Sequence, residues 1–136
     1  MQQSKLKLLL LILLCTATSQ PVLSKITFSS FNIKMFGHQN SQTNLESLAK
    51  EIKSISPDIL GVQEIIDGDK LETFQKERLA KFDLLLSKCG GFLEQKLGIF
   101  YLKSRFELLD SYEDDSLSTK SITCTGSLRP ALIAKF

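Results

Sequence analysis

The sequence predicts a mixed α/β (α+β) fold, in which strands and helices alternate before the pattern becomes antiparallel towards the end. Two observations predict it. Short runs of β-branched and aromatic residues recur along the chain, and stretches with apolar residues at helical spacing lie between them. The 136 residues are 43% hydrophobic and 24% charged, which is typical of one globular domain and excludes a disordered tail.

Local signals set the expected element boundaries. The first helix has Asn44 or Thr43 as its N-cap and ends before Pro57, because proline disfavours helical geometry in the residue before it. The second helix begins after a turn at 67–69. We predict strands over 26–33, 59–62, 97–102, 106–112 and 132–136, a hairpin turn at 103–105, and apolar helix faces at Leu45, Leu48, Ala49, Ile52 and Ile55 and at Leu71, Phe74, Leu79, Phe82 and Leu86.

Residues 1–24 have the pattern of a secretory signal peptide. A basic head with Lys5 and Lys7 precedes an unbroken apolar run, and small residues follow the run. The run is far shorter than the roughly 20 residues that span a bilayer, so no stable membrane span is expected after its removal. We predict cleavage after Ser19 or Ser24 and a secreted or periplasmic location for the remaining domain.

The domain predicted to remain, residues 25–136, is close to neutral. Without Lys5 and Lys7, 15 of the 17 basic residues face 15 acidic ones. This balance argues against a basic groove that grips nucleic acid by charge alone. The single histidine, His38, falls in a polar stretch and is expected in a solvent-facing loop.

Two cysteines, Cys89 and Cys124, belong to this domain. In an oxidising compartment they can form a disulfide, and the alternative is a pair of unconnected thiols. A zinc site is excluded because the chain has no Cys-x-x-Cys spacing and only one histidine.

Polar side chains follow two of the predicted strands. Asn32 lies at the end of the first strand, and Glu64 follows the strand over 59–62. Functional groups collect at the carboxyl ends of strands in open α/β sheets, so we expect these side chains side by side on one rim. Mg²⁺ prefers oxygen ligands and often takes only one or two protein carboxylates, which makes Glu64 a candidate metal ligand. The alternative is a glutamate that ends a strand and faces water.

Five short motifs follow one another along the chain. They are Phe31-Asn32-Ile33, the stretch 57–64 ending in Val62-Gln63-Glu64, the stretch 95–101, Leu109-Asp110-Ser111-Tyr112, and the stretch 128–136 containing Leu128-Arg129-Pro130. In this order they resemble the endonuclease/exonuclease/phosphatase superfamily, and above all its deoxyribonuclease I-like members. The resemblance implies the amino-terminal half of a four-layered α/β sandwich over residues 25–136, from a Mg²⁺-dependent phosphodiesterase that acts on DNA or another phosphodiester.

The resemblance also implies roles for individual residues. Glu64 matches the metal-binding glutamate, Asn32 matches a catalytic asparagine near the metal and phosphate, and Arg129 matches a catalytic arginine on the substrate side. Glu94 or Gln95 falls where nucleases have a glutamate that orients a catalytic histidine. Ile66 departs from the pattern, because deoxyribonuclease I-like enzymes have an arginine there that enters the DNA minor groove.

The catalytic histidines of this superfamily belong to a second half that the sequence does not contain. We therefore expect the chain alone to be inactive, as the amino-terminal fragment of an exported nuclease. Two alternatives stay open within this resemblance: a non-catalytic exported binding module, and a lipid or phosphoinositide phosphatase of the same superfamily. A small structural α/β domain with a coincidental likeness is the remaining reading.

Overall fold

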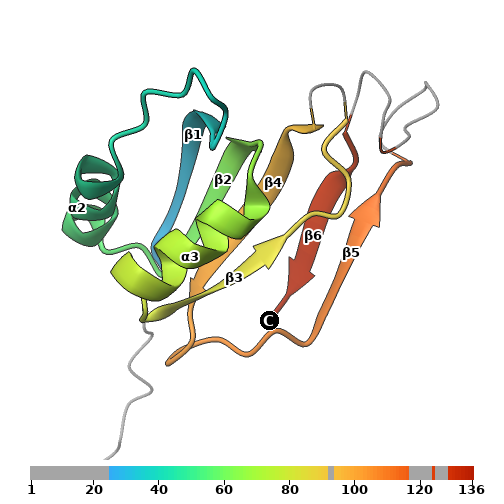
Figure 1. Cartoon of the computed structure of the whole chain (residues 1–136). Helices are drawn as coiled ribbons and strands as arrows, with labels where there is room; N and C mark the ends of the chain where they lie inside the picture. The colour runs from blue at the N-terminus through green and yellow to red at the C-terminus, as the bar shows by residue number, and fades with distance from the viewer. Residues whose placement is uncertain (1–24, 92–93, 117–123, 125–128) are drawn as a thin grey trace, which may run out of the picture.

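The computed structural model describes residues 25–91, 94–116, 124 and 129–136, and the expected signal segment lies outside them. These residues form a helical layer, a four-stranded sheet and a two-stranded sheet (Figure 1). In the described part of the chain, no helix is both long and apolar enough to cross a membrane. The elements are β1 (Phe28–Phe36), α2 (Leu45–Ile55), β2 (Ile59–Ile65), α3 (Gly68–Arg78), β3 (Phe82–Leu86), β4 (Lys96–Leu102), β5 (Asp110–Asp114) and β6 (Ala131–Lys135).

The larger sheet has the strand order β1-β2-β4-β3. Strands β1 and β2 are parallel, and β4 runs antiparallel to both β2 and β3. The carboxyl ends of β1 and β2 and the beginning of β4 therefore lie at the same end of the sheet, which we call the rim. The opposite end of the sheet, where β2 begins and β4 ends, is called the far end.

Helix α2 forms where the sequence predicts it. The Asn44 side chain accepts a hydrogen bond from the Ser47 N–H at 2.9 Å, which satisfies one of the donors that a helix start leaves without a partner. The helix ends at Ile55, and its C-cap Ser56 is left-handed and is followed by Pro57. Its apolar face buries Ala49 and Ile52 against the sheet, whereas Ile55, also predicted on that face, is exposed.

The second predicted helix is too long by three apolar positions, because Leu79 is only the C-cap of the helix and two further residues lie in a strand. Helix α3 begins after Asp67, whose side chain accepts from the Lys70 N–H, and buries Leu71 and Phe74. It ends at Arg78, and both Phe82 and Leu86 belong to β3 instead. The run from Phe82 to Leu86 is compatible with either period, and pairing with β4 decides in favour of the strand.

The predicted hairpin between 97–102 and 106–112 is also wrong. Strand β4 has β2 on one edge and β3 on the other, so no edge is left for β5. Strand β5 pairs with β6 instead, in register from Asp110 with Lys135 to Asp114 with Ala131. A local turn signal could not reveal that distant segments compete for the same edge.

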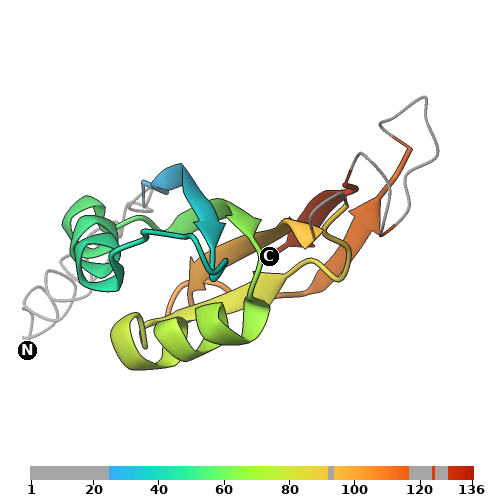
Figure 2. The same ribbon diagram turned by 45° about the horizontal axis from the view of Figure 1, so that its top comes forward.

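One buried cluster joins the helices to the larger sheet. The smaller sheet lies next to β4 (Figure 2). Phe136, after β6, packs on Tyr101 of β4 with ring centroids 4.9 Å apart and on Phe106 at 5.5 Å. Helices, large sheet and small sheet are thus successive layers, as expected for part of an α/β sandwich. The central cluster consists of Ile33, Phe36, Ala49, Ile52, Leu60, Val62, Ile65, Leu71, Phe74, Leu79, Phe82 and Phe100.

Candidate functional site

Asn32 and Glu64 meet at the rim, as their positions at strand ends predict. Asn32 lies opposite Gln63 in the parallel pairing of β1 with β2. Its Nδ2 donates to Glu64 Oε1 at 2.6 Å, and its Oδ1 accepts from the Lys34 N–H at 2.8 Å. A backbone N–H needs an acceptor, so the Lys34 contact fixes which end of the amide faces Glu64. Asn32 thereby holds one carboxylate oxygen in place.

Irregular backbone at the rim aims these two side chains. Glu64 is the extra residue of a bulge in β2, because Gln63 pairs with Leu97 while Ile65 pairs with Lys96. Glu64 has a φ of +66°, and in the neighbouring strand Lys34 and Met35 have φ values of +57° and +55°. A left-handed conformation costs roughly 1–2 kcal/mol for a residue with a Cβ. The sequence carries no glycine here to signal the bulges.

The rim offers carboxylate oxygen to a cation. Within the described residues, the only side-chain hydrogen bond of the half-buried Glu64 uses Oε1, which leaves Oε2 for another partner. Asn32 presents its amide nitrogen to Glu64 and its oxygen to the Lys34 N–H, so the carboxylate is the ligand. One carboxylate suits Mg²⁺, which keeps several waters and takes few protein ligands. No group of three or more His, Cys, Asp or Glu that could hold a metal ion occurs in the part of the chain that the structure describes. The donors therefore fit a Mg²⁺ ion shared with water and substrate, and not a closed protein cage.

Arg129 reaches the same edge of the sheet through Gln95. Its Nη1 donates to the Gln95 backbone oxygen at 2.8 Å and its Nη2 to Gln95 Oε1 at 3.3 Å. Gln95 directly precedes Lys96, the β4 residue paired with Ile65. The partner of Gln95 in this structure is thus an arginine. Glu94 is exposed and has a left-handed backbone conformation.

The segment between β3 and β4 is fastened to the smaller sheet. Cys89 forms a disulfide with Cys124, with the two Cα atoms 4.4 Å apart. Glu113 of β5 accepts from the backbone N–H groups of Lys88 and Cys89. Buried Ser87 accepts from the Leu97 N–H at 2.9 Å. These contacts fix the chain on both sides of Gln95. Sequence reasoning missed Ser87 and Glu113 because neither belongs to a recognisable motif.

A hollow of about 710 Å³ opens beside Asn32, between β1, the 37–43 loop and α2. The loop is shaped by Gly37, whose φ is +86° and whose missing Cβ leaves room for Asp67. His38 lies in this loop, as predicted, where it is partly exposed and lines the hollow. Its Nδ1 accepts from the Asn40 N–H at 3.1 Å. The polar run 37–43 was recognisable as a loop, but only the fold brings it over Asn32.

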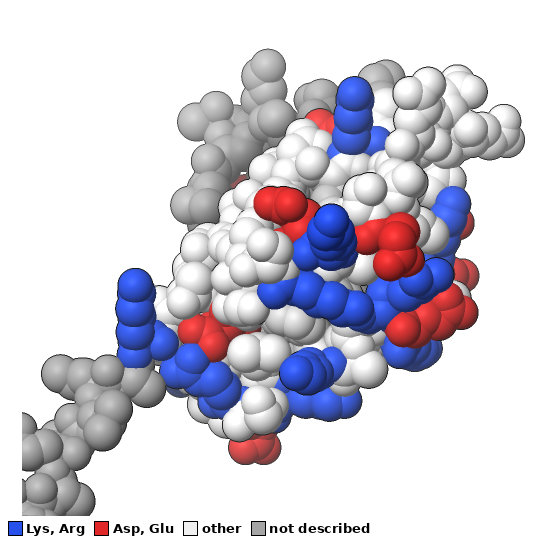
Figure 3. All heavy atoms as spheres, turned by 90° about the vertical axis from the view of Figure 1, so that its left-hand side faces the viewer, with Lys and Arg blue, Asp and Glu red and all other residues white. Residues whose placement is uncertain are grey.

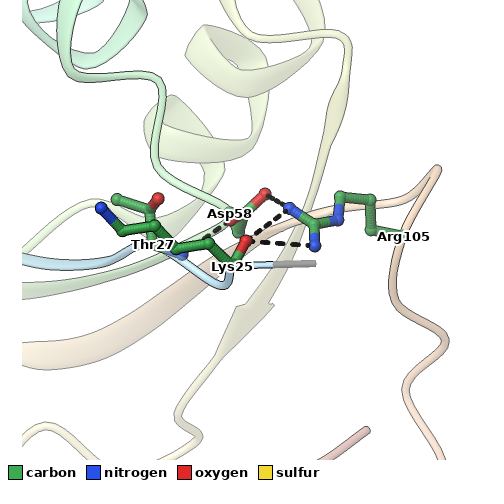
Figure 4. A network of polar contacts seen from close by, with 4 residues as sticks. All are labelled: Lys25, Thr27, Asp58 and Arg105. Carbon is green, nitrogen blue, oxygen red and sulfur yellow. Dashed lines mark hydrogen bonds and ion pairs between the residues drawn. The ribbon is translucent and has the colours of Figure 1, made fainter. Parts of the chain in front are cut away.

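The far end of the sheet carries a different polar network (Figure 4). Asp58 accepts from the Thr27 N–H at 2.7 Å and pairs with Arg105, whose guanidinium also donates to the Lys25 backbone oxygen. The Thr27 backbone hydrogen bond lowers the pKa of the Asp58 carboxyl, and Arg105 lowers it further. The Asp58 side chain is only 8% exposed. This network is closed and ties the beginning of β2 to the loop after β4.

Comparison with known proteins identifies the fold. No family model matches the chain, and no curated protein matches it in sequence. Among solved structures, it is similar to an endonuclease/exonuclease/phosphatase from Bacteroides vulgatus, with a TM-score of 0.55 and 23% sequence identity. The match covers 71% of this chain and 41% of that chain. The chain therefore has the fold of part of an endonuclease/exonuclease/phosphatase domain, and it spans less than half the length of this structural neighbour.

Proposed function

We propose that this chain is part of an exported Mg²⁺-dependent phosphodiesterase and carries its metal-binding glutamate. Nucleic acid is the substrate class that we favour. The observation that carries the proposal is the 2.6 Å contact between Asn32 Nδ2 and Glu64 Oε1. The contact lies at irregularities in two adjacent strands, where residues with a Cβ have costly left-handed backbones of the kind that gather at functional sites. The shared fold of the phosphodiesterase and phosphatase superfamily supports the same reading.

Each rim residue has a role in this proposal. Glu64 would hold Mg²⁺, which would polarise a phosphoryl oxygen and offset the charge that develops as water attacks. Asn32 would hold one oxygen of this carboxylate through Nδ2, which leaves the other for the metal. Gln95 uses two of the five N–H donors of Arg129 and so fixes the guanidinium, whose remaining donors can bind a substrate phosphate.

Export and the mode of substrate recognition rest on separate observations. The signal pattern of residues 1–24 and the disulfide between Cys89 and Cys124 both favour an oxidising compartment outside the cytosol. On the face that carries α2, Lys and Arg are interspersed with Asp and Glu (Figure 3). Substrate recognition would therefore depend on a few placed groups rather than on a basic surface.

The first experiment measures metal binding by the full chain and by Glu64→Gln. We expect Mn²⁺, used as a spectroscopic substitute for Mg²⁺, to bind the wild type and to bind the variant at least tenfold more weakly. Glu51→Gln is the matched control, because Glu51 is an exposed glutamate on α2. Equal Mn²⁺ affinity in wild type and Glu64→Gln would contradict the proposal.

A cleavage assay separates this function from its alternatives. We expect no measurable plasmid cleavage by the chain alone, because its one histidine, His38, uses Nδ1 to accept from the Asn40 N–H and is not hydrogen-bonded to Glu64. Mg²⁺-dependent cleavage that disappears in Glu64→Gln would show that these 136 residues are sufficient for the reaction. Release of phosphate from a phosphoinositide, with no action on DNA, would favour the lipid phosphatase alternative.

A further inference from the structure

The hollow beside Asn32 has the size and lining of a ligand site. Its volume of about 710 Å³ lies within the range of pockets that hold small molecules. It lies next to the Asn32–Glu64 pair, because Asn32 belongs to both. Its lining residues fall into an apolar group, Phe31, Ile33, Met35 and Leu48, and a polar group, Asn32, Lys34, His38, Asn40, Ser41, Gln42 and Thr43.

We propose that this hollow binds one nucleotide unit of the substrate, with the base on the apolar wall and the phosphate towards Lys34 and His38. The proposal rests on the proposed function, because it places a nucleotide of the substrate, next to the cleaved phosphodiester bond, beside the rim. It adds a binding site for one nucleotide, with specificity residues that the Asn32–Glu64 pair does not supply.

The mixed lining favours a nucleobase over other phosphate esters. A base has a flat face that stacks on apolar and aromatic side chains, and a polar edge that forms hydrogen bonds. Phe31, Met35 and Leu48 are partly exposed in the hollow, and Asn40 and Gln42 offer amide donors and acceptors on its polar side. An inositol ring carries hydroxyl groups all round and has no comparable apolar face.

The charged and hydrogen-bonding groups favour an anion. Lys34 is a cation at the edge of the hollow. His38 accepts the Asn40 N–H through Nδ1, so in the neutral ring Nε2 carries the proton and is a donor. Both groups suit a phosphate oxygen, and both oppose the quaternary ammonium of a choline headgroup.

The hollow is also held in shape before any ligand arrives. The Thr43 hydroxyl donates to the Ile33 backbone oxygen at 3.1 Å, and its oxygen accepts from the Ser41 hydroxyl at 2.8 Å. These contacts fasten the 37–43 loop to the bulged part of β1, so binding would cost little loop ordering.

The test is a binding titration of the full chain, followed by NMR, with EDTA present. The ligands are thymidine 5′-monophosphate, thymidine, inositol 1-phosphate and phosphocholine. We expect saturable shifts at the hollow with thymidine 5′-monophosphate, at a Kd on the order of 1 mM, and at least threefold weaker binding of the other three. Equal affinity for inositol 1-phosphate would overturn the assignment to a nucleotide.

Variants locate the site. His38→Ala and Lys34→Gln should each raise the Kd about five- to tenfold, whereas Lys53→Gln, on an exposed lysine of α2 outside the hollow, should leave it unchanged. The amide spectrum of each variant shows whether the fold is kept. Unchanged affinity in both His38→Ala and Lys34→Gln would overturn the proposal.

Measurement without metal separates this inference from the proposed function. Glu64→Gln should still bind thymidine 5′-monophosphate, since Glu64 does not line the hollow. If Mn²⁺ binds at Glu64 but no nucleotide binds, the nucleotide site is wrong and the metal-side function stands. If the nucleotide binds but Mn²⁺ does not depend on Glu64, the metal-side function is wrong and the nucleotide site stands.

Discussion

The two ends of the four-stranded sheet are built in opposite ways. At the far end, Asp58 directly precedes β2, is nearly buried and is hydrogen-bonded by Thr27 and Arg105. At the rim, Glu64 is half-buried with one hydrogen bond from the exposed Asn32, and its own backbone is left-handed. Both ends therefore hold a carboxylate, but among the residues that the structure describes only the one at the far end has partners for both oxygens.

This difference indicates which carboxylate stabilises the fold and which one is kept for chemistry. A buried acid with all its partners is costly to disturb, because its removal leaves the partners without acceptors. A strained, incompletely satisfied acid at a strand bulge lowers stability and is typical of a functional position. Three predictions test the comparison, in order of decreasing effect.

The largest effect is expected from the covalent link near the rim. The double variant Cys89→Ser/Cys124→Ser removes a link across a sequence separation of 35 residues, and the free energy of unfolding should fall by about 3–4 kcal/mol in the chain-entropy model. Denaturant unfolding of the oxidised protein and of the variant measures the difference. A loss below about 1 kcal/mol would show that Glu113 and Ser87 hold the segment without the disulfide.

The second effect concerns Asp58 and acid. Its pKa is lowered from 3.8 on folding, so the carboxylate stabilises the fold above that pH, and this contribution disappears as the pH falls through the lower folded value. Asp58→Asn should lower the Tm by about 5–10 °C at pH 7, and the gap from wild type should narrow below about pH 4.

Thermal melts at several pH values test this prediction, with Asp110→Asn as a control because Asp110 is exposed on β5. A gap in Tm between wild type and Asp58→Asn that stays constant from pH 7 to about pH 2 would show that the ionised carboxyl does not provide the stability.

The smallest effect is expected at the rim itself. Residue 64 has a φ of +66°, which glycine adopts without cost and alanine does not. Glu64→Gly should therefore be more stable than Glu64→Ala by about 1 kcal/mol, although both lose the carboxylate. Chemical denaturation of the two variants compares them directly. Equal stability would mean that the bulge relaxes once the side chain is gone.

Local patterns were sufficient for much of the fold and for one pair in the site. The Asn44 cap, the end of α2 before Pro57 and the core face of that helix follow from spacing and backbone preferences that act over a few residues. The approach of Asn32 to Glu64 was predictable because parallel strands place their carboxyl ends on one edge.

The errors arise where distant segments compete. Phe82 and Leu86 fit a helix by spacing, yet they pair with β4. The predicted hairpin after β4 fails because β2 and β3 already occupy both edges of that strand. Such outcomes depend on which backbone hydrogen bonds are available elsewhere, and no local window contains that information.

The sequence alone thus determined the class of fold, the helix caps and the two strand ends that meet at the rim. Only the tertiary structure decided that Gln95 holds Arg129, that Asp58 pairs with Arg105 and that His38 lines a hollow beside Asn32. The physical reason is range. Caps and periodicity arise from neighbours along the chain, whereas these contacts join residues brought together by sheet pairing and by bulges that no residue type announces.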